Sequence, residues 1–121
     1  MINKSTSIRA FIGAINYDES RDFYKKLGFV ETIIDKKMSL FRVNENLSFY
    51  LQDSYVKDWV DNSMLLLEVP DVDACMEDLI QRDLHNQYER VRLSKIRESH
   101  HGREIFMHDP SGVLWHFFQF N

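Results

Sequence analysis

The chain has 121 residues, of which 44% are hydrophobic and 28% charged, enough for one globular domain or two small packed modules. Its net charge of -4 argues against a nucleic-acid partner, because phosphate binding needs a cationic face. No apolar run approaches the roughly 20 residues that span a bilayer, and no apolar core follows Lys4 and Arg9 as it would in a signal peptide. The single cysteine, Cys75, cannot form an intrachain disulfide. We therefore expect a cytoplasmic protein with no membrane partner.

The first half of the chain predicts one strand, one helix and three further strands. Residues 7–15 are apolar with small side chains and predict the first strand. Asn16, with Glu19 three residues later, has the pattern of a capping box that begins a helix, and Gly28 ends that helix. The strands that follow are predicted at residues 29–34, 38–43 and 47–52.

The second half repeats this order after a polar stretch, residues 53–62, that has no clear periodicity and is interpreted as a connector. Residues 64–69 predict a strand, and Asp71 can cap a helix with apolar residues at helical spacing. Three more strands are predicted near residues 88–96, 103–108 and 113–120. The opening strands of the halves are offset by about 54 residues, which indicates a duplicated pattern of elements. We predict a single domain of two β-α-β-β-β modules, 1–53 and 63–121, joined by the connector 54–62.

The last two strands are joined by a turn with a specific residue order. Asp109-Pro110-Ser111-Gly112 fits a type I turn, since aspartate accepts a local hydrogen bond, proline presets φ, and the final glycine relieves crowding. The flanking strands contribute Gly102-Arg103-Glu104 before the turn and His116-Phe117 after it. A second motif with a specific residue order covers the end of the first predicted helix. It reads Ser20-Arg21-Asp22-Phe23-Tyr24-Lys25-Lys26-Leu27-Gly28-Phe29.

These two segments together resemble the glyoxalase/bleomycin-resistance/extradiol dioxygenase superfamily, also called the vicinal oxygen chelate fold. Their form is most similar to that of the bleomycin-resistance proteins. The resemblance covers nearly the whole chain and implies an α+β fold in which two paired modules with curved mixed sheets enclose a cleft. It also implies a homodimer with clefts at the subunit boundary.

The resemblance also predicts where a metal would bind if this chain were one of the superfamily's enzymes. The four ligand positions fall at Arg9, Tyr50, Met64 and His116, and only His116 is a strong metal ligand. A register slip of one residue does not help the first half, because residues 7–15 and 47–51 contain no histidine, aspartate or glutamate. We therefore expect no metal and no cofactor.

The residues expected to line a ligand cleft are Arg9, Tyr50, Met64, Leu66, His101 and His116. His101 stands where bleomycin-resistance proteins tend to have an aromatic residue, so its ring could stack on a flat ligand. His116 shares a strand face with Leu114 and Phe118, which leaves it either a ligand contact or a satisfied core histidine. Trp115 points the other way and is expected to pack on the helix layer. The direction of Glu104 is open.

Three functions are compatible with the residues. The favoured one is a metal-free protein that sequesters a small molecule, such as an antibiotic, in its cleft and catalyses no reaction. The alternatives are a metal-dependent lyase, isomerase or dioxygenase of the glyoxalase type, and a structural or regulatory dimer with no small-molecule role. The resemblance implies aromatic residues on the opening strand of the second half in members that bind bleomycin, and residues 64–68 contain none, so a ligand other than bleomycin is favoured.

Overall fold

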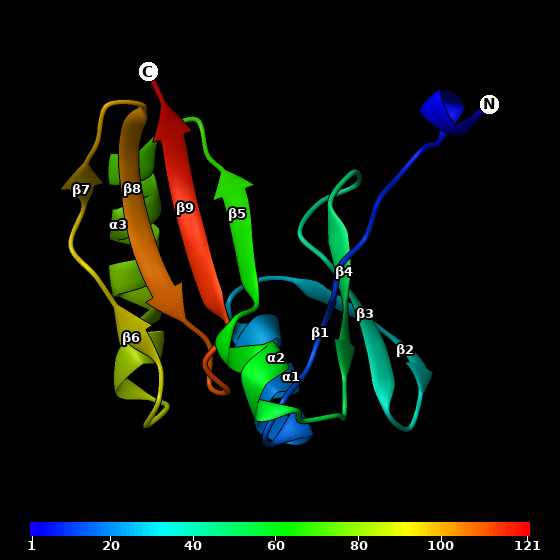
Figure 1. Cartoon of the computed structure of the whole chain (residues 1–121). Coiled ribbons are helices and arrows are strands. Elements are labelled where there is room, and N and C mark those ends of the chain that lie inside the picture. The colour runs from blue at the N-terminus through cyan, green and yellow to red at the C-terminus, as the bar shows by residue number, and fades with distance from the viewer.

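The computed structural model describes residues 1–121, in which two β-sheets stand side by side (Figure 1). The N-terminal sheet has the order β1 (Phe11–Ile12), β4 (Ser48–Gln52), β3 (Met38–Arg42) and β2 (Val30–Asp35). The C-terminal sheet has the order β5 (Met64–Glu68), β9 (Leu114–Phe120), β8 (Gly102–His108) and β6 (Arg92–Leu93), and β7 (Arg97–Glu98) also pairs with β8. β1 runs parallel to β4 and β5 parallel to β9, while the other pairs are antiparallel. The predicted α+β fold with mixed sheets is confirmed, whereas the module limits at 53 and 63 stay an interpretation.

The two long helices begin where their capping residues predict. α1 (Tyr17–Lys26) begins after Asn16, whose Oδ1 accepts a hydrogen bond from the backbone N–H of Glu19 at 3.1 Å. Gly28, at φ 104°, ends this helix in a left-handed conformation that favours glycine. α3 (Val72–Arg82) begins after Asp71, whose Oδ1 accepts from the N–H groups of the second and third helical residues. None of the helices combines the length and apolarity needed to cross a bilayer.

Three predicted elements differ from the observed ones. The strand predicted at 7–15 shrinks to Phe11–Ile12, because residues 1–10 are exposed and only these two residues pair with β4. The strand predicted near 88–96 is broken after Leu93. There the backbone N–H of Phe106 donates a hydrogen bond to Ser94 Oγ instead of to a backbone carbonyl. The connector contains α2 (Lys57–Asp61), a helix too short to show periodicity in the sequence. Two short 3-10 turns, η1 (Ile2–Lys4) and η2 (Leu84–Asn86), complete the chain.

Each sheet has one face covered by a helix and one open face. α1 packs on the N-terminal sheet and α3 on the C-terminal sheet. On β4, Phe49 and Leu51 are buried, while Tyr50 between them lies on the open face. On β9, Trp115 and Phe117 are buried, while His116 lies on the open face. The alternation places the aromatic core between the sheets and the helices.

Candidate functional site

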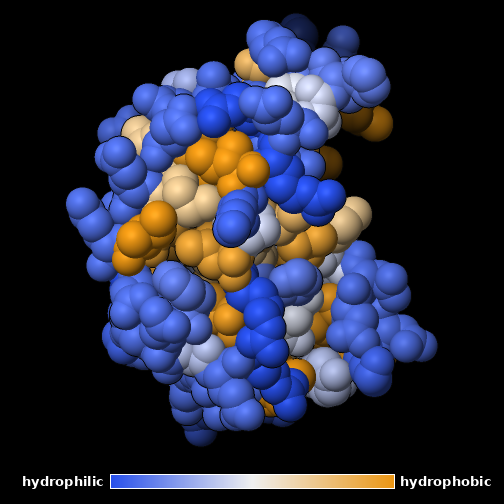
Figure 2. All heavy atoms as spheres, turned by 90° about the vertical axis from the view of Figure 1, so that its left-hand side faces the viewer, coloured by the Kyte–Doolittle hydropathy of each residue, from blue (hydrophilic) through white to orange (hydrophobic).

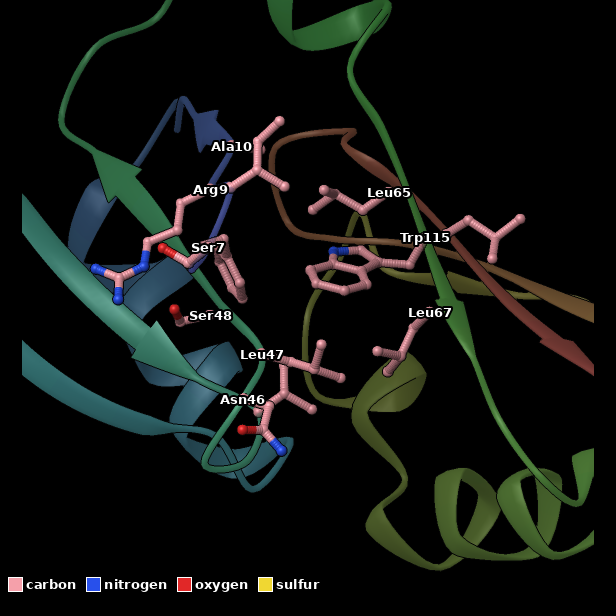
Figure 3. A pocket seen from close by; sticks show the side chains of 13 residues that line it. Ser7, Arg9, Ala10, Asn46, Leu47, Ser48, Leu65, Leu67 and Trp115 are labelled. Atoms are coloured by element: carbon pink, nitrogen blue, oxygen red, sulfur yellow. The ribbon is translucent and has the colours of Figure 1, made fainter. Parts of the chain in front are cut away.

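A hollow of about 420 Å³ opens between the two sheets, and we call it the inter-sheet cleft (Figure 3). Its walls come from the chain entering β1, the β3–β4 region and β5, the edge strand of the C-terminal sheet. The lining is mostly aliphatic and aromatic, as in small-molecule sites generally. It consists of Ser7, Ile8, Arg9, Ala10, Val43, Asn46, Leu47, Ser48, Phe49, Leu65, Leu66, Leu67 and Trp115.

The floor of the inter-sheet cleft is a pair of fixed aromatic rings. Trp115 and Phe49 meet edge to face with ring centroids 5.3 Å apart, and both are almost fully buried. The indole Nε1 of Trp115 donates a hydrogen bond to the hydroxyl of Tyr24 on α1 at 2.9 Å. Trp115 therefore faces the helix layer, as expected. The floor therefore presents apolar ring surface, and its polar N–H is already satisfied.

A buried carboxylate anchors this floor to the turn between β8 and β9. The Tyr24 hydroxyl donates to Asp109 Oδ2 at 2.6 Å, and the N–H groups of Ser111 and Val113 donate to Asp109 Oδ1. Asp109 is fully buried, and this burial raises the pKa of its carboxyl to about 6. The hydrogen-bond chain from Trp115 through Tyr24 to Asp109 links α1 of the first half to the turn of the second half.

Arg9 lines the inter-sheet cleft with its stem but directs its charge elsewhere. Its Nη1 donates to the Tyr50 hydroxyl at 3.2 Å, and its guanidinium carbon lies 5.9 Å from the centre of the Tyr50 ring. The Phe11 ring stacks on the Tyr50 ring, with centroids 4.8 Å apart. Figure 3 shows the guanidinium turned away from the Trp115 indole. Tyr50, predicted to line the cleft, lies on the open face and does not line it.

Met64 and His116 meet on the open face of the C-terminal sheet. His116 Nδ1 lies 3.4 Å from Glu104 Oε2, and His116 Nε2 lies 3.5 Å from Met64 Sδ. The Phe106 ring contacts the imidazole edge to face at 5.0 Å. We call these four residues the His116 cluster. The open question about Glu104 is thereby answered, since it shares the face of His116, but none of the four lines the inter-sheet cleft.

His101 is set apart from the other predicted site residues. It precedes β8, is exposed, and its backbone N–H donates to Ser99 Oγ while its carbonyl accepts from the N–H of Asn121. Of the six predicted residues, the structure brings Arg9 and Leu66 to the inter-sheet cleft and pairs Met64 with His116 outside it.

The sequence reasoning missed the residues that form most of the cleft wall. Leu65 and Leu67 alternate with the predicted Met64 and Leu66, so the prediction chose the right strand but named only Leu66 of its three cleft-lining residues. The alternation along β5 shows that Leu65 and Leu67 share one face of the strand. It does not show that this face meets the other sheet. Trp115 was placed correctly on the helix side but was not connected with a cleft.

A second, shallower hollow lies outside this region, between α3 and the segment that joins β6 to β7. It measures about 350 Å³ and is lined by Met76, Ile80, Leu93, Ser94, Lys95 and Ile96. Figure 2 shows the side of the molecule that carries β6 and β7, where apolar side chains gather in a patch surrounded by hydrophilic ones. We call this hollow the α3 groove.

The donor set does not fit the metal centre that the fold's enzymes imply. Of the four implied positions, Arg9 is a permanent cation, Tyr50 is engaged with that cation, and Met64 offers only a soft thioether. His116 has one carboxylate neighbour, Glu104, and no group of three histidine, cysteine, aspartate or glutamate side chains converges anywhere in the chain. A divalent ion needs three or more such donors.

Solved structures with the same arrangement of elements cover almost the whole chain. A bleomycin-binding protein from Streptomyces verticillus, solved with copper(II)-bleomycin, superposes with a TM-score of 0.78 at 21% identity, covering 97% of this chain and 99% of that one. TnmS3, an antibiotic binding protein from Streptomyces sp. CB03234, superposes with a TM-score of 0.74 at 19% identity, covering 97% and 98%. The fosfomycin resistance protein FosX from Listeria monocytogenes, solved with Mn(II) and sulfate, gives 0.72 at 12% identity, covering 97% and 91%.

The chain therefore has the fold of these antibiotic-binding and fosfomycin-resistance proteins, as the sequence motifs predict. It has the architecture of the bleomycin-resistance proteins. No protein-family profile matches the sequence, and no curated protein matches it. At these identities the similarity defines the fold, so the function has to come from the residues of this chain.

Proposed function

We propose that this protein binds a small molecule, such as an antibiotic, in the inter-sheet cleft and sequesters it without catalysing a reaction. The observation that carries the proposal is the cleft itself, an apolar hollow of about 420 Å³ with a rigid aromatic floor. Its volume lies in the range of about 300–1,000 Å³ that small-molecule sites occupy. Proteins of the same fold bind antibiotics, which supports this role.

The two alternative functions have less support. A metalloenzyme of the glyoxalase type needs ligands that Arg9, Tyr50 and Met64 do not supply. A purely structural or regulatory dimer would be expected to fill the space between its sheets with side chains, whereas here the space is open. A binding protein needs only the cleft and its fixed walls.

The proposal includes a homodimer, in which a second copy covers the open faces of the sheets. These faces expose Phe11 on β1 and Met64 and Leu66 on β5, apolar side chains that a second copy would remove from water. It also includes a cytoplasmic location, since the single cysteine gives no disulfide framework of the kind that extracellular domains use.

A thermal-shift screen of antibiotics, bleomycin included, tests the binding role. The wild type is compared with Ala10→Trp, which fills the inter-sheet cleft, and with Ala74→Trp, which adds the same ring to the exposed side of α3. We expect at least one compound to raise the melting temperature of the wild type and of Ala74→Trp but not of Ala10→Trp. Mass spectrometry should then recover the compound unchanged. Equal stabilisation of all three proteins would place binding outside the cleft, and conversion of the compound would favour an enzyme.

A further inference from the structure

We infer that the inter-sheet cleft takes an uncharged, largely apolar molecule and discriminates against charged ones. The inference rests on the proposed function, because it names the class of ligand for the same site. It follows from three features of the lining: where its charge points, which polar groups are free, and what the floor offers.

No charged group faces the interior of the inter-sheet cleft. The lining contains no aspartate, glutamate, lysine or histidine, and its one arginine, Arg9, is bound to Tyr50 on the open face. An ion that left water for the apolar floor of this cleft would lose hydration, and the one charge at the rim, the Arg9 guanidinium, is turned away from Trp115, so the transfer costs far more than that of a neutral group. Both a cationic and an anionic ligand are therefore disfavoured.

The polar groups that remain are neutral and lie on one side. The hydroxyls of Ser7 and Ser48 and the side-chain amide of Asn46 line the cleft and make no hydrogen bond to the protein. All three labelled side chains lie on the side formed by β1 and β4, opposite Leu65 and Leu67 (Figure 3). They can donate to or accept from a carbonyl, ether or hydroxyl of a neutral ligand.

The floor of the inter-sheet cleft has no free hydrogen-bond donor that a ligand would have to satisfy. The indole N–H of Trp115 is taken by Tyr24, so the ring presents carbon to the cleft. A ligand that fits has an apolar body against Trp115, Leu65 and Leu67, and one uncharged polar edge toward Ser7 and Ser48. Burying this body removes apolar surface from water, which favours binding.

Competition between ligands that differ only in charge tests this assignment. The reporter is N-phenyl-1-naphthylamine, a neutral dye whose fluorescence rises in apolar sites. The competitors are 1-naphthylmethanol, 1-naphthoate and 1-naphthylmethylammonium, which carry the same rings with charges of zero, minus one and plus one. The protein carries Trp59→Phe, so that energy transfer to the dye comes from Trp115 alone.

We expect energy transfer from Trp115, and displacement of the dye by the alcohol at a concentration about tenfold lower than by either ion. Leu67→Lys and the gentler Ser48→Lys place a cation in the cleft and should reverse the order of the alcohol and the naphthoate. Ile80→Lys puts the same charge at the α3 groove, outside the cleft, and should leave the order unchanged.

The remaining outcomes separate the two proposals. If the dye binds with energy transfer but the ions compete as well as the alcohol, the ligand class is wrong and the binding role stands. If the dye does not bind, or Ile80→Lys alone removes its binding, both fail. If dye binding falls as the chain dimerises, a second copy covers the cleft and the inference is overturned.

Discussion

At the scale of single residues, Asp109 links the folding of the protein to pH. Its carboxylate has no solvent contact, and burial raises its pKa from 3.8 to about 6. Since the folded state binds the proton more tightly than the unfolded state, the free energy of unfolding falls as pH rises between these values. We expect a loss of up to about 3 kcal/mol from this residue between pH about 4 and about 6.

Asp109→Asn isolates this effect, because asparagine has nearly the same shape and does not titrate. Urea unfolding at several pH values should show the decrease in the wild type relative to the variant. The difference between the two proteins is the quantity to compare, since the ion pair with Arg21 lowers the pKa of Glu31 and makes an opposite contribution. A difference that does not change with pH would show that Asp109 stays charged throughout.

The donor atoms at the four implied metal positions lead to a second prediction at this scale. After incubation with Zn²⁺, Ni²⁺, Mn²⁺ or Fe²⁺ and desalting, elemental analysis should find close to no metal bound to the chain. The reason is that Arg9 repels a cation and that His116 has only Glu104 as a charged oxygen neighbour. A ratio near one metal per chain would contradict this prediction and would favour a metal-dependent enzyme over a binding protein.

The site was only partly predictable from these residues. Alternation along β9 correctly separated Trp115 from His116, because the period of a strand is fixed. It could not show which of the two faces borders a cleft, since that depends on how the sheets stand relative to each other. The same limit applies on β5, where Leu66 was predicted and Leu65 and Leu67 were missed.

At the scale of elements, the sequence was most informative where a local hydrogen bond fixes the chain. The turn at Asp109 forms as predicted, with the N–H of Gly112 donating to the Asp109 carbonyl at 3.1 Å. Elements without such a signal were harder to predict. β6 and β7 are separated where Ser94 Oγ accepts a hydrogen bond from the backbone N–H of Phe106, 12 positions away, which no local pattern reveals.

The cap of α3 yields a prediction of its own. Asp71→Ala removes the acceptor for the N–H groups of Asp73 and Ala74, which then have no protein partner. We expect the free energy of unfolding to fall by about 1 kcal/mol in chemical denaturation. Asp71→Asn keeps an acceptor oxygen at the same place and should lose much less. Equal losses in both variants would mean that the carboxylate charge, and not the cap, stabilises the helix.

At the scale of the whole molecule, the two halves share one core although each builds its own sheet. Tyr24 of α1 hydrogen-bonds both Trp115 and Asp109 of the second half, at distances of 2.9 and 2.6 Å. The order of elements predicted the two sheets but not this contact between them, because it joins residues 91 and 85 positions apart. The inter-sheet cleft is a product of that arrangement.

The open faces of the sheets lead to the prediction of a dimer. On β5, Met64 of the His116 cluster is 62% exposed and Leu66 is 54% exposed, and covering them would remove apolar surface from water. Light scattering after size exclusion should therefore give twice the chain mass of 14.5 kDa.

Met64→Lys tests whether this face is the interface, because a lysine there meets its symmetry mate across a two-fold axis or loses its hydration. We expect it to shift the equilibrium toward the monomer. Ile80→Lys, on the exposed side of α3, changes a residue of similar exposure away from the open faces and should leave the dimer intact. If Ile80→Lys dissociates the dimer and Met64→Lys does not, the copies meet through the α3 groove, and the open faces stay free for ligands.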